Sequence, residues 1–243
     1  MRLSTLLAGS VLMALGIGAN ANANIIVHQS NFISSPAFFN GFEAINSSPN
    51  FFNLGGSNFY PTNTTYSEGG ITIQYVGCCS PIWLDPAIQG NFGWYPNGGS
   101  FGYDKITLTG GGNFQNIQFL SGNGYGLDTT LAYQLLAQGL VVTSGTITNA
   151  AFPSHYIGFS GGGFDEVDLQ SGFFSTFDPA NFEALIIDSV AANGRAANVP
   201  EPSTLPLFGA ALMACLLAFR RRKQSTYIGV PQQGPFKADH YRY

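Results

Sequence analysis

Short strand-like runs separated by glycine-rich clusters recur along most of the chain, and this spacing constrains the fold more than any other feature. Several runs alternate apolar and polar residues, as in ITIQYV and KITLT. The clusters between them, such as YPNGGS, GGGN and SGNGYG, are typical of turns. Many short strands joined by such turns predict an all-β body with a sandwich architecture. The runs are residues 24–28, 41–45, 71–76, 105–109, 114–120, 131–136, 140–148, 155–160, 166–170 and 182–191.

One run is ambiguous by composition. LAYQLLAQG, residues 131–139, has the residue types of a helix. LVVTSGTIT follows it directly, so we expect a strand that enters a hairpin, with Ser144 and Gly145 as a turn. The whole chain favours strands too, because it holds 31 Gly, 21 Phe and 11 Tyr and is only 9% charged.

Charge is divided unevenly along the chain. Residues 24–198 contain two basic and eleven acidic residues, a formal charge of −9, while most basic residues lie near the two ends. An acidic body argues against a nucleic-acid partner, because binding phosphates requires Lys and Arg.

The first 23 residues have the three parts of a secretory signal peptide. Arg2 supplies a basic start, residues 3–17 form an apolar stretch, and Ala21-Asn22-Ala23 is a small-residue cleavage site. The mature chain is expected to begin near Asn24. The alternative is an uncleaved N-terminal anchor.

A second apolar run, residues 202–219, lies near the C-terminus and is followed by Arg220, Arg221, Arg222 and Lys223. As a helix its 18 residues would be about 27 Å long, against a hydrocarbon core of about 30 Å. We expect a transmembrane helix whose basic end stays cytoplasmic, so that the body faces outward. A permanent single-pass anchor is the simpler interpretation.

Pro200-Glu201-Pro202, the apolar run and the arginine cluster together resemble the PEP-CTERM sorting signal of Gram-negative bacteria, across residues 199–223. The resemblance implies that an exosortase-type enzyme is the partner and that the helix holds the chain in the inner membrane only until processing. The body, residues 24–198, would then reach the cell surface or extracellular matrix. Residues 224–243 extend beyond the usual end of such signals, and their polar composition predicts a disordered cytoplasmic tail.

The order of GGNFQNIQFLSG, YIGFSGGGFDEVDL and FEALIIDSVAA resembles that of jelly-roll sandwiches in lectin-like and carbohydrate-binding modules. The resemblance implies a jelly-roll type of sandwich for the body.

Residue patterns that would indicate catalysis are weak in the sequence. Two Gly-x-Ser-x-Gly strings occur, at residues 98–102 and 158–162, but no helix is predicted after either of them, as a nucleophile elbow requires. No phosphate-binding glycine loop or metal-type histidine spacing occurs. We therefore expect no enzyme, no cofactor and no metal site. A hydrolase remains the alternative, because a pair of glycosidase carboxylates needs no local motif.

Cys78 and Cys79 are adjacent, and Cys215 lies inside the apolar run. In an oxidising compartment body cysteines are expected to pair. Three states stay open from the sequence: a disulfide between the two neighbours, two free buried thiols, or links to another chain.

Trp83, Trp94 and Tyr95 flank the segment LDPAIQGNFG. Exposed, these rings could stack on a sugar and make the body a carbohydrate-binding module with a polysaccharide partner. Alternatively they pack in the core or against loops. Asp165, Glu166 and Asp168 offer oxygen ligands for Ca²⁺, or they form a solvated acidic face with Glu166 and Asp168 on the same side. We favour the solvated face and a non-catalytic surface protein.

Overall fold

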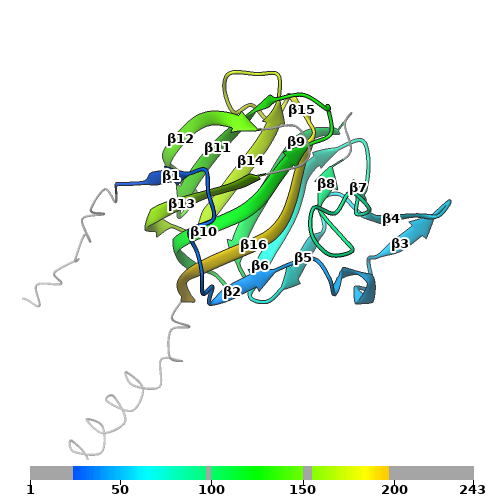
Figure 1. Cartoon of the computed structure of the whole chain (residues 1–243), viewed down its shortest axis with the longest axis horizontal. Coiled ribbons are helices and arrows are strands. Elements are labelled where there is room, and N and C mark those ends of the chain that lie inside the picture. The colour runs from blue at the N-terminus through cyan, green and yellow to red at the C-terminus, as the bar shows by residue number, and fades with distance from the viewer. Residues whose placement is uncertain (1–23, 97–99, 150–154, 197–243) are drawn as a thin grey trace, which may run out of the picture. The chain divides into compact units, whose positions relative to one another are not determined.

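The body contains only β-structure in the residues that a computed structural model describes, 24–96, 100–149 and 155–196 (Figure 1). Within these ranges the regular elements are strands and one 3₁₀ turn, Ile45–Ser47. Every strand pair is antiparallel. The prediction of an all-β body is therefore confirmed. The chain divides into two compact units, residues 1–197 and 198–243, and the second lies outside the described residues.

The largest sheet has seven strands in the order β12-β11-β14-β9-β6-β5, with β15 paired to β9. Its middle strands alternate as the sequence predicts: Ile71, Ile73 and Tyr75 are buried, and the residues between them are partly exposed. One face of this sheet therefore lies against the core. The strands are β5 (Thr65–Glu68), β6 (Ile71–Cys78), β9 (Ser100–Leu108), β11 (Thr129–Ala137), β12 (Leu140–Asn149), β14 (Glu166–Gly172) and β15 (Phe182–Glu183).

A second sheet has five strands in the order β1-β13-β10-β16-β2. The last strand in the sequence, β16, lies inside this sheet between β10 and β2 (Figure 1). It follows β10 from Gly112, opposite Ala196, to Asn123, opposite Leu185. The strands are β1 (Ile26–His28), β2 (Phe38–Asn40), β10 (Gly112–Asn123), β13 (His155–Phe164) and β16 (Leu185–Ala196).

These two sheets share one apolar core. Tyr133 of β11 lies 4.8 Å from Phe159 of β13 between ring centroids, and Phe119 of β10, in the same sheet as Phe159, lies 6.5 Å from it. The core cluster draws its buried residues from strands of both sheets. Burial of these large side chains is the main favourable contribution to folding.

A small third sheet has the order β3-β4-β7-β8. Its strands are β3 (Phe52–Leu54), β4 (Ser57–Tyr60), β7 (Ile82–Trp83) and β8 (Tyr95–Pro96). These four strands and β5 are not predicted by the sequence pattern, because runs of two to four residues are too short to display alternation. The long glycine- and asparagine-rich segments between the predicted strands therefore carry structure of their own.

Most predicted strands are present, with two corrections. Residues 41–45 do not form a strand: Phe42 has φ 62°, and the chain turns there into the 3₁₀ element, while the strand lies just before it at Phe38–Asn40. Residues 182–191 form two strands, because Ala184 separates β15 from β16. The remaining eight predicted runs all overlap strands.

Residues 131–139 lie in and just after β11, which pairs with β12 as a hairpin, so the preference for strand over helix is confirmed. The predicted turn is wrong. Ser144 and Gly145 lie within β12, and the chain reverses at Gln138 and Gly139, whose φ values are 53° and 76°. Two successive positive φ values are the mark of the tight hairpin turn that matches strand twist.

No helix within residues 24–96, 100–149 and 155–196 is long and apolar enough to cross a membrane. The predicted signal peptide, the predicted C-terminal helix and the tail all lie outside these ranges.

Candidate functional site

Trp94 and Tyr95 lie inside the body rather than on its surface. Trp94 is 0% exposed and Tyr95 is 7% exposed. The backbone of Trp94 forms a two-way bridge with Ile187 of β16, with N–H to O distances of 2.9 Å in both directions. This bridge draws the segment against the sheet, so the expectation of exposed stacking rings is wrong for these two residues.

Trp83 is half-buried, and its polar atom is already occupied. Its indole Nε1 donates to Asp85 Oδ2 at 2.7 Å, and its ring lies 6.1 Å from that of Tyr95. Asn58 donates to the same carboxylate from its backbone N and from Nδ2. Burial alone would raise the pKa of Asp85, but these hydrogen bonds outweigh it and hold the pKa below its usual value. The three aromatic residues therefore do not form one exposed platform.

The interior next to Trp94 contains two fully buried carboxyl groups. Trp94 Nε1 donates to Asp104 Oδ1 at 2.7 Å. Glu183 accepts from the backbone N–H groups of Ser171 and Leu185, at 2.9 Å each. Both side chains are 0% exposed. No described residue forms an ion pair with either of them.

Burial raises the pKa of Asp104 well above its usual value, and the hydrogen bond from Trp94 offsets part of that effect. Burial and then the negative charge of Asp104 raise the pKa of Glu183, against the two backbone hydrogen bonds. Raised pKa values are what general acids require. Here, however, neither carboxyl has any surface at which a substrate could touch it.

Tyr75 completes this interior cluster. Its hydroxyl group lies close to Gly102, where φ is +146°. A Cβ at this position would lie 2.9 Å from Tyr75 Oη and 2.3 Å from the carbonyl oxygen of Val76, so only glycine fits there. Tyr75 Oη, Ser100 Oγ and Asp104 Oδ2 are buried, and none of them forms a hydrogen bond of good geometry within the described residues. Burial and the charges of Glu183 and Asp104 raise the pKa of the Tyr75 hydroxyl.

The acidic stretch after β13 does not form the predicted solvated face. Asp165 accepts from the backbone N–H of Gln138 at 2.9 Å, and Glu166 pairs with Lys105 at 2.8 Å. Asp168 is only 4% exposed. Burial, followed by the charge of Glu166, raises its pKa to about 7 against the opposing effect of Lys105.

The burial of Asp168 has no local sequence signal. Two residues further along β14, Gln170 Nε2 donates to the carbonyl oxygens of Asp178 at 2.8 Å and Asn181 at 3.3 Å. The segment after β14 therefore folds back over the outer face of its own strand, which alternation cannot reveal. Across the described ranges, no group of three or more His, Cys, Asp or Glu side chains is arranged to hold a metal ion.

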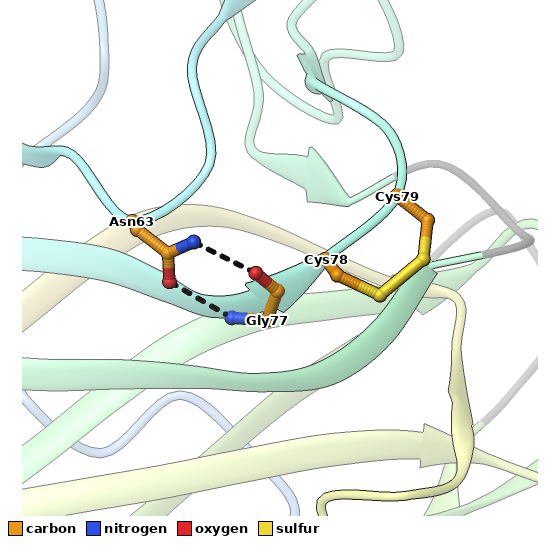
Figure 2. Close-up of a disulfide and its surroundings, with 4 residues drawn as sticks. All are labelled: Asn63, Gly77, Cys78 and Cys79. Carbon is orange, nitrogen blue, oxygen red and sulfur yellow. Dashed lines mark hydrogen bonds between the residues drawn. A yellow bond between two sulfur atoms is a disulfide. The ribbon is translucent and has the colours of Figure 1, made fainter.

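Cys78 and Cys79 are joined by a disulfide at the exposed end of β6 (Figure 2). Of the three states that the sequence leaves open, the structure has the bond between neighbours. Figure 2 shows the adjoining clamp: Asn63 Nδ2 donates to the carbonyl oxygen of Gly77 at 2.7 Å, and Gly77 N donates to Asn63 Oδ1 at 3.1 Å. Asn63 N also donates to the carbonyl oxygen of Tyr75 at 2.8 Å. Asn63 thus continues the pairing along β6 beyond the end of β5.

A surface hollow of about 430 Å³ lies near the 3₁₀ turn and was not predicted. Tyr60, Tyr66, Ser48 and Asn50 line part of it. The hydroxyl groups of Tyr60 and Ser48 are 3.2 Å apart, and Tyr66 Oη donates to Glu68. Its polar groups bond mainly to each other, so the hollow presents no convergent set of unused donors.

The comparison with known families identifies the C-terminal segment. Residues 198–223 match the PEP-CTERM protein-sorting motif. No curated protein matches the chain. The match covers Pro200, Glu201, Pro202 and the arginine cluster, so the resemblance seen in the sequence is confirmed. The motif begins two residues after Ala196, the last residue of β16.

The chain therefore carries a PEP-CTERM sorting motif, which implies processing by exosortase, a membrane enzyme, and export to the surface or beyond. The motif implies a transient membrane-anchored state before export.

Proposed function

We propose that the body is a jelly-roll β-sandwich passenger that acts as a non-catalytic structural or adhesive component of the cell envelope or the exopolysaccharide matrix. The main observation in support is that the sorting motif begins two residues after the last described strand, β16. Processing near Pro200 to Pro202 would release residues 24–199 with every described strand intact. The motif thus delivers a complete folded body.

The burial of the acidic residues supports a non-catalytic role. Burial raises the pKa values of Asp104 and Glu183 well above their usual values, and both side chains are 0% exposed. A glycosidase needs its carboxyl pair on either side of a bound sugar. A pair enclosed by the core is better suited to stability than to hydrolysis.

The sorting part of the proposal is tested by replacing Pro200, Glu201 and Pro202 with Ala, Gln and Ala in the full chain within its native cell. The wild-type protein is expected to have an intact mass that begins near Asn24 and ends near Pro200. The variant should keep its C-terminal segment and remain in the membrane fraction, because the triplet lies where processing is expected.

The matched control replaces Pro231 and Pro235 of the tail with Ala and should be processed like the wild type. A wild-type chain that still ends at Tyr243 would refute the sorting route and leave a permanently anchored surface protein. Equal processing of the triplet variant would refute the role of Pro200 to Pro202.

A further inference from the structure

Strand β12 differs from every other edge strand of the three sheets. The sheets end in β12 and β5, in β1 and β2, and in β3 and β8. β12 is ten residues long, whereas the other five have two to four residues. Proteins commonly protect an open edge by keeping it short, so β12 is the one edge here that lacks this protection.

β12 also lacks the chemical protections of an edge. Its sequence, LVVTSGTITN, contains no charged residue and no proline. Leu140, Val141 and Val142 are exposed by 73%, 51% and 48%. A lysine or proline on an edge normally prevents a second strand from adding to it. The opposite edge of the same sheet, β5, has only four residues and carries the charged residue Glu68.

The backbone of β12 is regular enough to accept a strand. The one irregularity in its pairing with β11 lies between Leu135 and Leu136, close to the turn. From Thr143 to Thr148, each residue of β12 faces one residue of β11. At about 3.4 Å per residue, this gives a straight edge of about 20 Å. The stretch ends at Asn149, which is buried and whose carbonyl oxygen accepts from Asn123 Nδ2 at 3.2 Å and from Thr129 Oγ1 at 3.4 Å.

The charge distribution identifies the partner that fits this edge. Residues 24–198 have a formal charge of −9, so two copies repel each other over most of their surface. The two strands of the hairpin, residues 129–149, contain no charged residue. Two copies can therefore approach edge to edge at β12 without opposing like charges. An antiparallel strand pair is also self-complementary about a two-fold axis, as a symmetric dimer requires.

We propose that β12 is a homotypic docking edge, on which β12 of a second copy of this chain adds antiparallel and extends the seven-stranded sheet across both molecules. The two-fold axis crosses the strand between Thr143 and Thr148. This inference rests on the sheet edge alone and not on the export route, so either can fail without the other. It supplies a way in which a surface protein of this kind assembles side by side.

The first test compares sedimentation of the mature wild-type protein with that of Thr146→Lys. Thr146 is exposed in the middle of the edge, so a lysine there is compatible with the fold and blocks addition of a strand. The wild type should form a concentration-dependent dimer, and Thr146→Lys should weaken dimerisation at least ten-fold with an unchanged circular dichroism spectrum. The matched control, Ser67→Lys on the short edge β5, should dimerise like the wild type.

The second test locates the axis by cross-linking. Ser144, Thr146 and Thr148 are exposed on the same strand and are replaced singly by Cys, in a chain whose three native cysteines are Ser. Oxidation should yield a covalent dimer whose amount is greatest at one of these positions and falls at the others, while Ser67→Cys should yield none. A wild-type protein that is monomeric at all concentrations would overturn the proposal. Dimerisation that Thr146→Lys leaves unaffected, or equal cross-linking at Ser67, would do the same.

Discussion

The interior around Trp94 and the hairpin of β11 and β12 differ in where they place charged and apolar side chains. The interior buries two carboxyls that could have been at the surface and holds them with an indole N–H and backbone N–H groups. The hairpin, in the same acidic body, contains no charge and exposes three aliphatic side chains. With only Lys105 and Arg195 as body cations, the interior had to be satisfied by neutral donors. We therefore expect single substitutions in the interior to lower the free energy of unfolding more than single substitutions in the hairpin.

The largest effect is expected from Trp94→Ala. This change removes a fully buried ring and the indole N–H that donates to Asp104, so the free energy of unfolding should fall by about 4 kcal/mol or more. Guanidinium unfolding of the mature protein measures it. Trp83→Ala, at a half-buried ring, should cost about 1 kcal/mol. An equal loss of unfolding free energy in the two variants would contradict the assigned difference in burial between Trp94 and Trp83.

The next effect depends on pH through Asp168. Its folded-state pKa is about 7 against an ordinary value of 3.8, so the folded state binds the proton more tightly. Stability should be greatest at low pH and should fall as the pH rises towards and through 7, by about 2–3 kcal/mol between pH 5 and pH 8. Asp168→Asn should flatten this dependence in unfolding measured across that range.

Asp85 provides a control of opposite sign. Its pKa is lowered, so its contribution is present at neutral pH and lost as the pH falls through the folded-state pKa. Asp85→Asn should therefore destabilise the protein at pH 8, where Asp168→Asn stabilises it. The same sign for both variants at pH 8 would contradict the burial argument.

A moderate effect is expected at Asn63, whose clamp lies beside the disulfide. Asn63→Ala removes two hydrogen bonds to Gly77 and places alanine at φ 59°, so unfolding free energy should fall by about 1–2 kcal/mol. Reduction of the Cys78–Cys79 bond by dithiothreitol, followed by mass, should become faster as the strand end loosens. Asn63→Asp keeps the acceptor and should give an intermediate rate of reduction. An unchanged rate in both variants would show that the Asn63 hydrogen bonds do not affect the disulfide.

The smallest effect is expected at the hairpin turn. Gln138 has φ 53° followed by Gly139 at 76°, a conformation that asparagine adopts more readily than glutamine. Gln138→Asn should raise the unfolding free energy by about 0.5 kcal/mol, visible as a small rise in Tm. Gln134→Asn, in the regular part of β11, is the control and should give no such gain.

Much of the fold could be predicted from alternation, and what failed depended on distant contacts. Asp104 has the same parity in its strand as Ile106 and Leu108, so its burial could have been inferred from the sequence. The burial of Trp94 could not, because it depends on a bridge to Ile187, 93 positions away in sequence. The segment after β14 bonds to Gln170, two residues from Asp168, and alternation along the strand cannot reveal such a contact.

The sorting motif was the most predictable part of the chain, because the order of its residues identifies it and no tertiary contact is needed. The disulfide was only one of three options in the sequence. The Asn63 clamp could not be foreseen, since nothing local links Asn63 to Gly77.

The central place of β16 also sets an order of events in time. A chain is made from its N-terminus, so residues 185–196 appear after every other strand, yet β10 and β2 both need them as a neighbour. The five-stranded sheet cannot close before residues 185–196 have been made, and its closure joins segments far apart in sequence, which is intrinsically slow. The sheet is therefore incomplete until synthesis reaches the sorting motif, which begins two residues after the strand that completes it.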